Sequence, residues 1–370
     1  MPKHHGLSLK RFIFAIPWNL FERYFSQLEP QARPSAWAFL NPLVLEEFLN
    51  DPHNEAAPAI FEDFQRMNDL AGRHVGLLFR AFERAQLQFD QEQTPEAMAM
   101  WLFVDDRNAF EYAWSLYLFL AVPCPVYEYR FPAGSLHPQN EDIERLKAFL
   151  SGWFSNSKKG EQCHIAWFEN EEGILIRVSR GSLLKTVSRW KGNEIAFETF
   201  RPASEDIIAY DAGASRLSIK CSVKRDREKY VRGFAEFIAG NAELADIASS
   251  GKVFSLDPIR DGTFDFGGAG AISRISLTEA HIKLRSLGEP VLAIRSDNVL
   301  RTLAEDLPGV SLTLGELIKV RMRFELQTED GKRTRDVSFE IAPPSSSELS
   351  QKAYARIIES YLRDQGVKLI

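Results

Sequence analysis

The spacing of apolar residues changes part-way along this chain, and the change limits the folds open to it. Between Ile60 and Phe89 apolar side chains recur every three or four positions, which is the spacing of one face of an α-helix. Beyond about residue 161 apolar and polar residues alternate instead. A period of two is typical of strands with one buried face. The sequence therefore predicts helices first and a sheet second.

The first part, residues 1–155, is predicted to be a helical domain. The pattern from Ile60 to Phe89 predicts one long amphipathic helix. Shorter helices are predicted at 42–49, 94–103, 107–120 and 141–154. Thr94 and Asn140 are expected to cap two of them, with Pro95 at a first helical position. The polar stretch SNSKKGEQ that begins at Ser155 marks the predicted domain boundary.

The second part, residues 161–370, is predicted to be a sheet domain with a few packed helices. Hairpins are predicted for 163–170 with 174–180, 206–211 with 216–221, and 318–327 with 336–341. Helices are predicted at 227–239, 298–305 and 346–365. Strand clusters interrupted by isolated helices favour an α+β fold with a mainly antiparallel sheet over a doubly wound parallel sheet.

Composition indicates a cytoplasmic protein. Cys124, Cys163 and Cys221 lie far apart and form no CxxC pair, so neither a disulfide framework nor a zinc site is predicted, and a reducing compartment fits best. The apolar run at 12–21 is interrupted by Pro17 and Asn19 and is not expected to be a signal peptide. The run at 113–127 is shorter than the roughly 20 residues that cross a bilayer, so no membrane insertion is predicted.

The glycine-rich stretch at 264–277 comes nearest to a cofactor motif. Gly268, Gly270 and Ser273 have the spacing of GxGxxG, and Asp297 ends a predicted strand further on. In a dinucleotide site the glycines let backbone amides approach a pyrophosphate at a helix N-terminus, and the acid holds a ribose hydroxyl. However, residues 272–278 are rich in isoleucine and serine, which are poor material for a first helical turn. We favour a glycine loop that opens a bulged strand, and no cofactor is predicted; helix or strand for 272–284 stays open.

Two nuclease patterns are incomplete. His281 and Lys283 have the HxK spacing of phospholipase-D-like nucleases, but Gly288 stands where the pattern needs aspartate. Asp211, Ser218 and Lys220 have the order of a PD-(D/E)xK site, but serine replaces the metal-binding glutamate. Neither pattern predicts activity. The seven histidines are spaced so that they build no metal site, and no metal is predicted.

A basic strand offers a candidate nucleic-acid surface. Lys319, Arg321 and Arg323 alternate along one strand, and Arg335 follows the adjoining turn. Such a sheet face could track phosphates. Acidic residues share that surface, and the aromatic side chains that single-stranded nucleic acid needs for stacking are missing there. An ordinary solvated face is therefore the simpler interpretation.

Two functional hypotheses remain open. The favoured one is a non-catalytic recognition or assembly protein that acts through protein partners or a second copy of itself, because each catalytic pattern lacks an obligatory residue. The alternative is an enzyme on nucleic acid or nucleotides in residues 161–370. Accessory components of bacterial operons, phage-defence sensors among them, often have this organisation, so a role of that type is one expectation.

Overall fold

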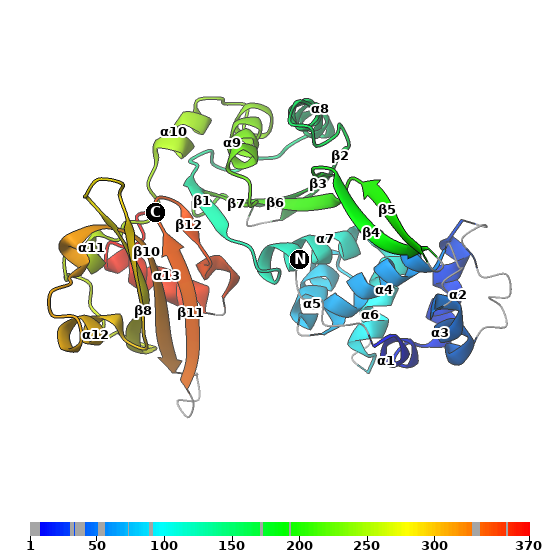
Figure 1. The fold of residues 1–370 in the computed structure, drawn as a ribbon. Coiled ribbons are helices and arrows are strands. Elements are labelled where there is room, and N and C mark those ends of the chain that lie inside the picture. Colours follow the sequence, from blue (N-terminus) through cyan, green and yellow to red (C-terminus); the bar gives the residue numbers. More distant parts are fainter. Residues whose placement is uncertain are drawn as a thin grey trace. The chain divides into compact units, whose positions relative to one another are not determined.

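The computed structural model describes residues 8–29, 33, 41–50, 56–72, 74–88, 92–170, 173–191, 194–327, 334–352 and 354–370. The chain forms two compact units, residues 1–123 and 124–370. Helices make up the described part of the first unit, and a large antiparallel sheet with packed helices makes up the second (Figure 1). The predicted α+β class is confirmed. Within the described residues, no helix is long and apolar enough to span a bilayer.

The helices of the first unit pack around aromatic side chains. Phe12, Phe21, Tyr24 and Phe64 are buried, and the rings of the first three each contact the ring of Phe64. The helices are α1 (Leu9–Phe14), α2 (Trp18–Gln27), α3 (Pro42–Asn50), α4 (Ala57–Ala71), α5 (Val75–Arg84), α6 (Pro95–Asp105) and α7 (Arg107–Leu120). Thr94 caps α6 as predicted, since its side chain accepts a hydrogen bond from the Ala97 amide at 3.1 Å.

The single long helix predicted from Ile60 to Phe89 is wrong. α4 ends at Ala71, because Gly72 adopts φ −72° and ψ −121°, outside the helical region, and α5 begins at Val75. Both helices bury one apolar face, so the three-to-four spacing continues across the break. Phe89 lies outside the described residues.

One sheet of ten strands runs through the second unit, in the order β2-β3-β6-β7-β1-β12-β11-β10-β8-β9. All paired neighbours are antiparallel. The three predicted hairpins are confirmed as β2 with β3, β6 with β7, and β10 with β11. The strands are β1 (Val126–Arg130), β2 (Cys163–Asn170), β3 (Gly173–Gly181), β6 (Ala203–Asp211), β7 (Arg216–Lys220), β8 (Ile272–Leu284), β9 (Val291–Arg295), β10 (Gly315–Gln327), β11 (Thr334–Ala342) and β12 (Ser346–Ser347).

Helices cover this sheet over two separate cores. One core lies under α8 and α9, and the other lies between β8, β10, β11 and α13. The helices are α8 (Asn140–Asn156), α9 (Lys224–Gly233) with a π-helical turn at Phe234–Ile238, α10 (Leu244–Ser250), α11 (Asp257–Arg260), α12 (Val299–Glu305) and α13 (Ala355–Asp364). The predicted helices at 141–154, 227–239 and 298–305 correspond to α8, α9 with its π turn, and α12.

The division into units differs from the boundary expected after residue 155. Leu146, Leu150 and Phe154 of α8 pack into the same core as Ile176 and Ile208 of the sheet. The first strand, β1, also precedes α8 and pairs with β7 and β12. The structure therefore groups α8 with the sheet, because the helix buries its apolar face there.

Two details of the predicted helices are wrong. The residue that caps α8 is Gln139, not Asn140; its side chain and that of Asp142 form a reciprocal capping box. The final helix covers only Ala355–Asp364 instead of 346–365. Ser346 and Ser347 pair with β1 and β11 instead, and a 3₁₀ turn follows at Leu349–Gln351.

Candidate protein interface

A two-stranded arm extends from the sheet of the second unit. β4 (Lys185–Lys191) and β5 (Glu194–Phe200) pair only with each other among the described strands. They lie between β3 and β6 in the chain, and β3 and β6 pair out to Gly181 and Ala203. The arm is therefore the outer end of one long hairpin, which continues beyond the neighbouring strands β2 and β7 (Figure 1).

Hydrogen bonds fix the base of the arm to the sheet. The Ser182 amide donates to the Pro202 carbonyl at 2.8 Å. Arg201 Nη1 donates to the carbonyls of Ser182 and Lys158, both at 2.7 Å. Gly181 lies so close to the chain that a Cβ atom there would be 2.2 Å from the Lys159 carbonyl. The arm therefore leaves the sheet in a defined direction.

One face of the arm has no charged residue. Its members are the cross-strand pairs Thr186 with Thr199, Ser188 with Phe197, and Trp190 with Ile195, and we call these six residues the uncharged arm face. Trp190, Ile195 and Phe197 are 71%, 58% and 77% exposed. The two threonine hydroxyls share a hydrogen bond of 2.9 Å. This face presents large apolar side chains to solvent over two adjoining strands.

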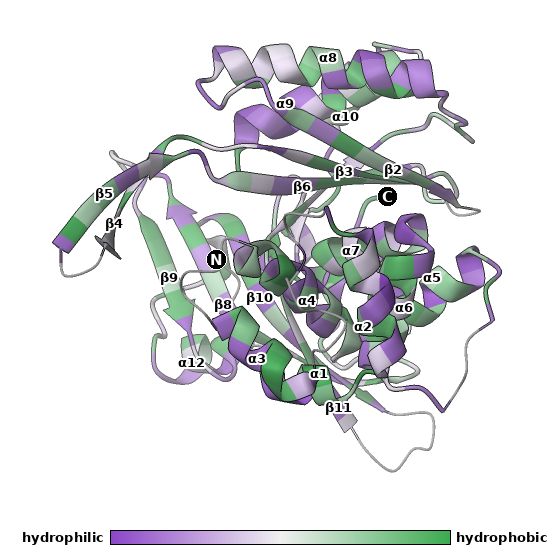
Figure 2. Cartoon of the chain, turned by 90° about the vertical axis from the view of Figure 1, so that its right-hand side faces the viewer, coloured by the Kyte–Doolittle hydropathy of each residue, from purple (hydrophilic) through white to green (hydrophobic). Residues whose placement is uncertain are grey.

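The reverse face of the arm is different. Lys185, Glu194 and Glu198 lie on it by the same register, together with Ala196, Val187 and Phe200; the last two are 40% and 43% exposed. The arm thus has one uncharged face and one face that mixes charged and apolar side chains, with apolar segments along β5 (Figure 2). A contiguous exposed apolar patch of this kind marks an interaction surface, and aromatic side chains are enriched at the centres of protein interfaces.

The arm is not among the hairpins predicted above, although the sequence contains a signal for it. Gly192 and Asn193 separate two segments that alternate in polarity, which is a recognised hairpin pattern. The exposure of Trp190 and Phe197 was not readable from the sequence, because alternation alone does not show whether a helix covers the apolar face.

The glycine stretch forms a loop before a strand. Residues 272–284 are β8, so the strand interpretation is confirmed. Gly268 has φ +79°, and a Cβ atom there would lie 2.5 Å from the Ile272 carbonyl. Gly270 also has positive φ, Ser273 lies in β8, and Asp297 follows β9. Since no helix starts behind the glycines, the structure offers no helix N-terminus to hold a pyrophosphate there.

In the first nuclease pattern both side chains are paired with carboxylates, and in the second the acid and the lysine lie apart along the strands. His281 Nε2 is 2.6 Å from Glu279 Oε1, and Lys283 pairs with Glu289. In the other pattern Asp211 lies opposite Arg216, whereas Lys220 lies opposite Ile207, four residues away along β6. Ser218 lies between them on β7. The strand register therefore keeps the acid and the lysine from forming one site.

The basic strand face is largely paired with carboxylates. Lys319 Nζ lies 3.3 Å from Glu279 and 3.0 Å from Glu340, and Arg321 lies 3.3 Å from Glu340. Arg323 has a buried Nε without a hydrogen-bond partner. Arg335 lies opposite the core residue Leu326, so it belongs to the other face of the sheet. The structure brings three of the four predicted cations together and separates Arg335 from them.

A buried carboxylate cluster lies under α8 and α9. Asp206, Cys221 and Asp226 place possible ligand atoms within 4.8 Å of one another, the one such group found among the described residues. Arg180 lies 2.7 Å from Asp206 and 3.1 Å from Asp226, and Lys159 pairs with Asp226. Burial raises the pKa of the Cys221 thiol to about 12. Cations of the chain therefore already balance these carboxylates, and the sulfur stays protonated, which disfavours a thiolate ligand.

A second charged cluster links the sheet to the last helix, α13. Lys368 Nζ lies 3.1 Å from Glu128 and 2.8 Å from Glu359, and Arg216 lies 3.0 Å from Glu359. Glu128 and Lys368 are almost fully buried. Burial alone would raise the pKa of Glu359, but Lys368 and Arg216 outweigh it and lower that pKa. The cluster has a structural role, because it ties β1 and β7 to α13 and the chain end.

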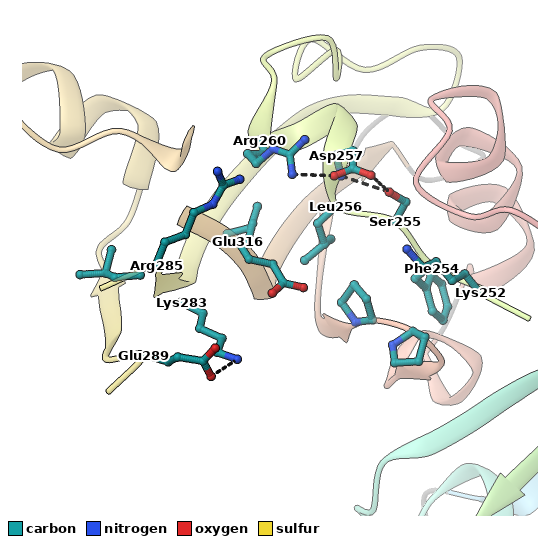
Figure 3. A pocket seen from close by; sticks show the side chains of 14 residues that line it. Lys252, Phe254, Ser255, Leu256, Asp257, Arg260, Lys283, Arg285, Glu289 and Glu316 are labelled. Carbon is teal, nitrogen blue, oxygen red and sulfur yellow. Dashed lines mark hydrogen bonds and ion pairs between the residues drawn. The ribbon is translucent and has the colours of Figure 1, made fainter. Parts of the chain in front are cut away.

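A cavity of about 580 Å³ opens beside β8 and β10 (Figure 3). Its lining mixes both signs of charge: Lys283 pairs with Glu289, and Arg260 lies 2.9 Å from Asp257. Ser255 also donates to Asp257 at 2.9 Å. No histidine lines the cavity, and the carboxylate next to the serine already accepts from a cation. The lining therefore offers no serine activated by a free base.

Known protein families and curated sequences give no information on the function of this chain. No protein-family model matches this chain, and no curated protein sequence matches it.

Proposed function

We propose that this protein is a non-catalytic, cytoplasmic recognition or assembly protein that acts through protein partners, and that the uncharged arm face is its contact surface. The observation that carries the proposal is the exposure of Trp190, Ile195 and Phe197 on one face of a hairpin held at its base. Exposed aromatic side chains cost solubility, and they are retained where a partner covers them.

The chemistry of the face fits a protein partner. Trp and Phe supply large contact areas with few rotatable bonds, so little conformational entropy is lost when they are buried. The threonine hydroxyls at the base of the arm can form hydrogen bonds at the rim of such a contact. An accessory role in a bacterial operon, such as a sensor in phage defence, stays a prediction from the organisation of the chain.

Photo-cross-linking tests this proposal. Phe197→p-benzoylphenylalanine places a reactive group on the uncharged arm face, and Val187→p-benzoylphenylalanine places the same group on the reverse face as the matched control. In cells of the source organism, irradiation should give a discrete protein adduct with the first variant and little or none with the second. The same weak ladder from both positions, or no adduct at position 197, would show that this face does not contact protein.

A further inference from the structure

We propose that the partner of the uncharged arm face is a second copy of this chain, bound face to face about a two-fold axis. This inference rests on the proposed function above and names the occupant. Three features support it: the absence of charge on the face, the graded size of its side chains, and the area that two such faces would bury.

The absence of charge makes the face compatible with itself. In a two-fold contact each residue meets the same surface patch on the other copy, so any charge on the face would meet a like charge. The uncharged arm face contains three apolar residues and three hydroxyl residues. The charged residues whose side chains are described, Lys185, Glu194 and Glu198, lie on the reverse face, away from the second copy.

The side chains of the face are graded along the arm. The pair Trp190 with Ile195 lies nearest the turn, Ser188 with Phe197 in the middle, and Thr186 with Thr199 at the base. If two ribbons stack with their strands running in opposite directions, the large outer pair of one copy lies over the small basal pair of the other. This arrangement keeps the two ribbons close to the spacing of about 10 Å at which sheets pack.

The same symmetry places the two Phe197 side chains next to each other. The two-fold axis crosses the middle row, so residues of that row meet their own counterparts. Phe197 is the most exposed of the three apolar members of the face, at 77%, and an aromatic pair at the centre of a contact adds stabilisation beyond the area it buries. Phe197 is therefore the residue on which the arrangement depends most.

The buried area is sufficient for a reversible dimer. Trp and Phe side chains bury about 150–250 Å² each, so the exposed parts of this face amount to roughly 500 Å² per copy. Two copies would then bury about 1,000 Å², which is the lower limit for a specific interface. We expect a dimer that dissociates at micromolar concentrations.

A charge-swap experiment tests the arrangement by sedimentation velocity of the full chain. Wild type at about 50 µM should have a mass twice the 42.1 kDa of one chain. Phe197→Glu and Phe197→Lys should each be monomeric, because like charges then meet at the axis. An equimolar mixture of the two variants should restore the dimer, since a carboxylate faces an ammonium group across the axis only in the mixed pair. Val187→Ser, on the reverse face, should leave wild-type association unchanged.

Three results would contradict the proposal of a second copy. A monomeric wild type at this concentration excludes a second copy as the occupant, while a cross-link from position 197 to a different protein would leave the proposed function intact. Dimers of Phe197→Glu and Phe197→Lys alone would place the contact elsewhere on the chain. Failure of the mixture to associate would overturn the two-fold stacking that brings residue 197 against itself.

Discussion

Single charged side chains in the second unit are held by several partners at once. Glu279 is 4% exposed and has His281, Arg295 and Lys319 within 3.3 Å. Burial alone would raise the pKa of Glu279, but hydrogen bonds from these three side chains outweigh it and lower the pKa to about 2. A carboxylate in this setting stabilises the strand pairs β8–β9 and β8–β10, because its partners come from all three strands.

The stability of the second unit should fall in acid through Glu279. Its folded pKa of about 2 lies below the ordinary value of 4.5, so its contribution is complete above pH 4.5 and is lost as the pH falls towards 2. Glu279→Gln should lower the free energy of unfolding at pH 7 and make its decline in acid shallower. Urea denaturation between pH 7 and pH 2 measures this.

A matched control for Glu279 is Glu305→Gln. Glu305 pairs with Arg301 on the exposed surface of α12, where an ion pair contributes little, so this variant should follow wild type. Parallel acid curves for wild type and Glu279→Gln would contradict the assigned role of the Glu279 carboxylate.

At the level of elements, the loop that contains Gly268 and Gly270 leads the glycine-rich stretch into a strand. The glycines before β8 permit a tight turn, after which the Gln327 amide bonds to the Ala271 carbonyl at 2.8 Å and the chain enters the sheet beside β10. Gly268 needs both its positive φ and the absence of a side chain, whereas Gly270 has positive φ and open space around it. A side chain should therefore be tolerated less well at position 268 than at position 270.

Alanine at these glycines should separate the two requirements. Gly270→Ala should cost about 1–2 kcal/mol, the penalty of left-handed backbone for a residue with a Cβ atom. Gly268→Ala should cost more, because its Cβ would be 2.5 Å from the Ile272 carbonyl and the backbone must shift. Thermal unfolding measures both. Equal losses of stability in the two alanine variants would contradict the turn geometry.

A nucleotide site at these glycines has a separate test. If NAD⁺ or ATP raised the melting temperature of wild type but not of Gly270→Val, the result would indicate such a site.

For the whole molecule, the second unit has its own cores. Both clusters of buried apolar residues described above lie within 124–370, and β1 supplies the strand between β7 and β12. The sheet is therefore complete only when the chain is followed from β1 onward.

Two fragments test this division. Residues 124–370 should fold alone, with a β-rich circular dichroism spectrum and a cooperative thermal transition. Residues 161–370, cut at the boundary expected from sequence, should not, because they lack β1 and the apolar face of α8 that contributes Leu146, Leu150 and Phe154 to one core. A folded 161–370 fragment, or an unfolded 124–370 fragment, would contradict the two-unit division.

The sequence by itself determined the fold class, the three main hairpins and the cap of α6, because each depends on local spacing that one segment contains. It did not determine where the Ile60–Phe89 pattern is interrupted, because α4 and α5 bury faces with the same period. It placed α8 in the wrong group, since an amphipathic helix does not specify which surface covers it.

Only the tertiary structure showed which side chains come together and which are exposed. Strand register separated Asp211 from Lys220 and Arg335 from Arg323, and opposing carboxylates paired Lys319 and Arg321. The alternation in 185–200 was visible in the sequence, but only the fold showed that β3 and β6 carry these strands beyond their neighbours and leave Trp190 and Phe197 exposed. Exposure depends on what the rest of the chain covers, and local spacing does not contain that information.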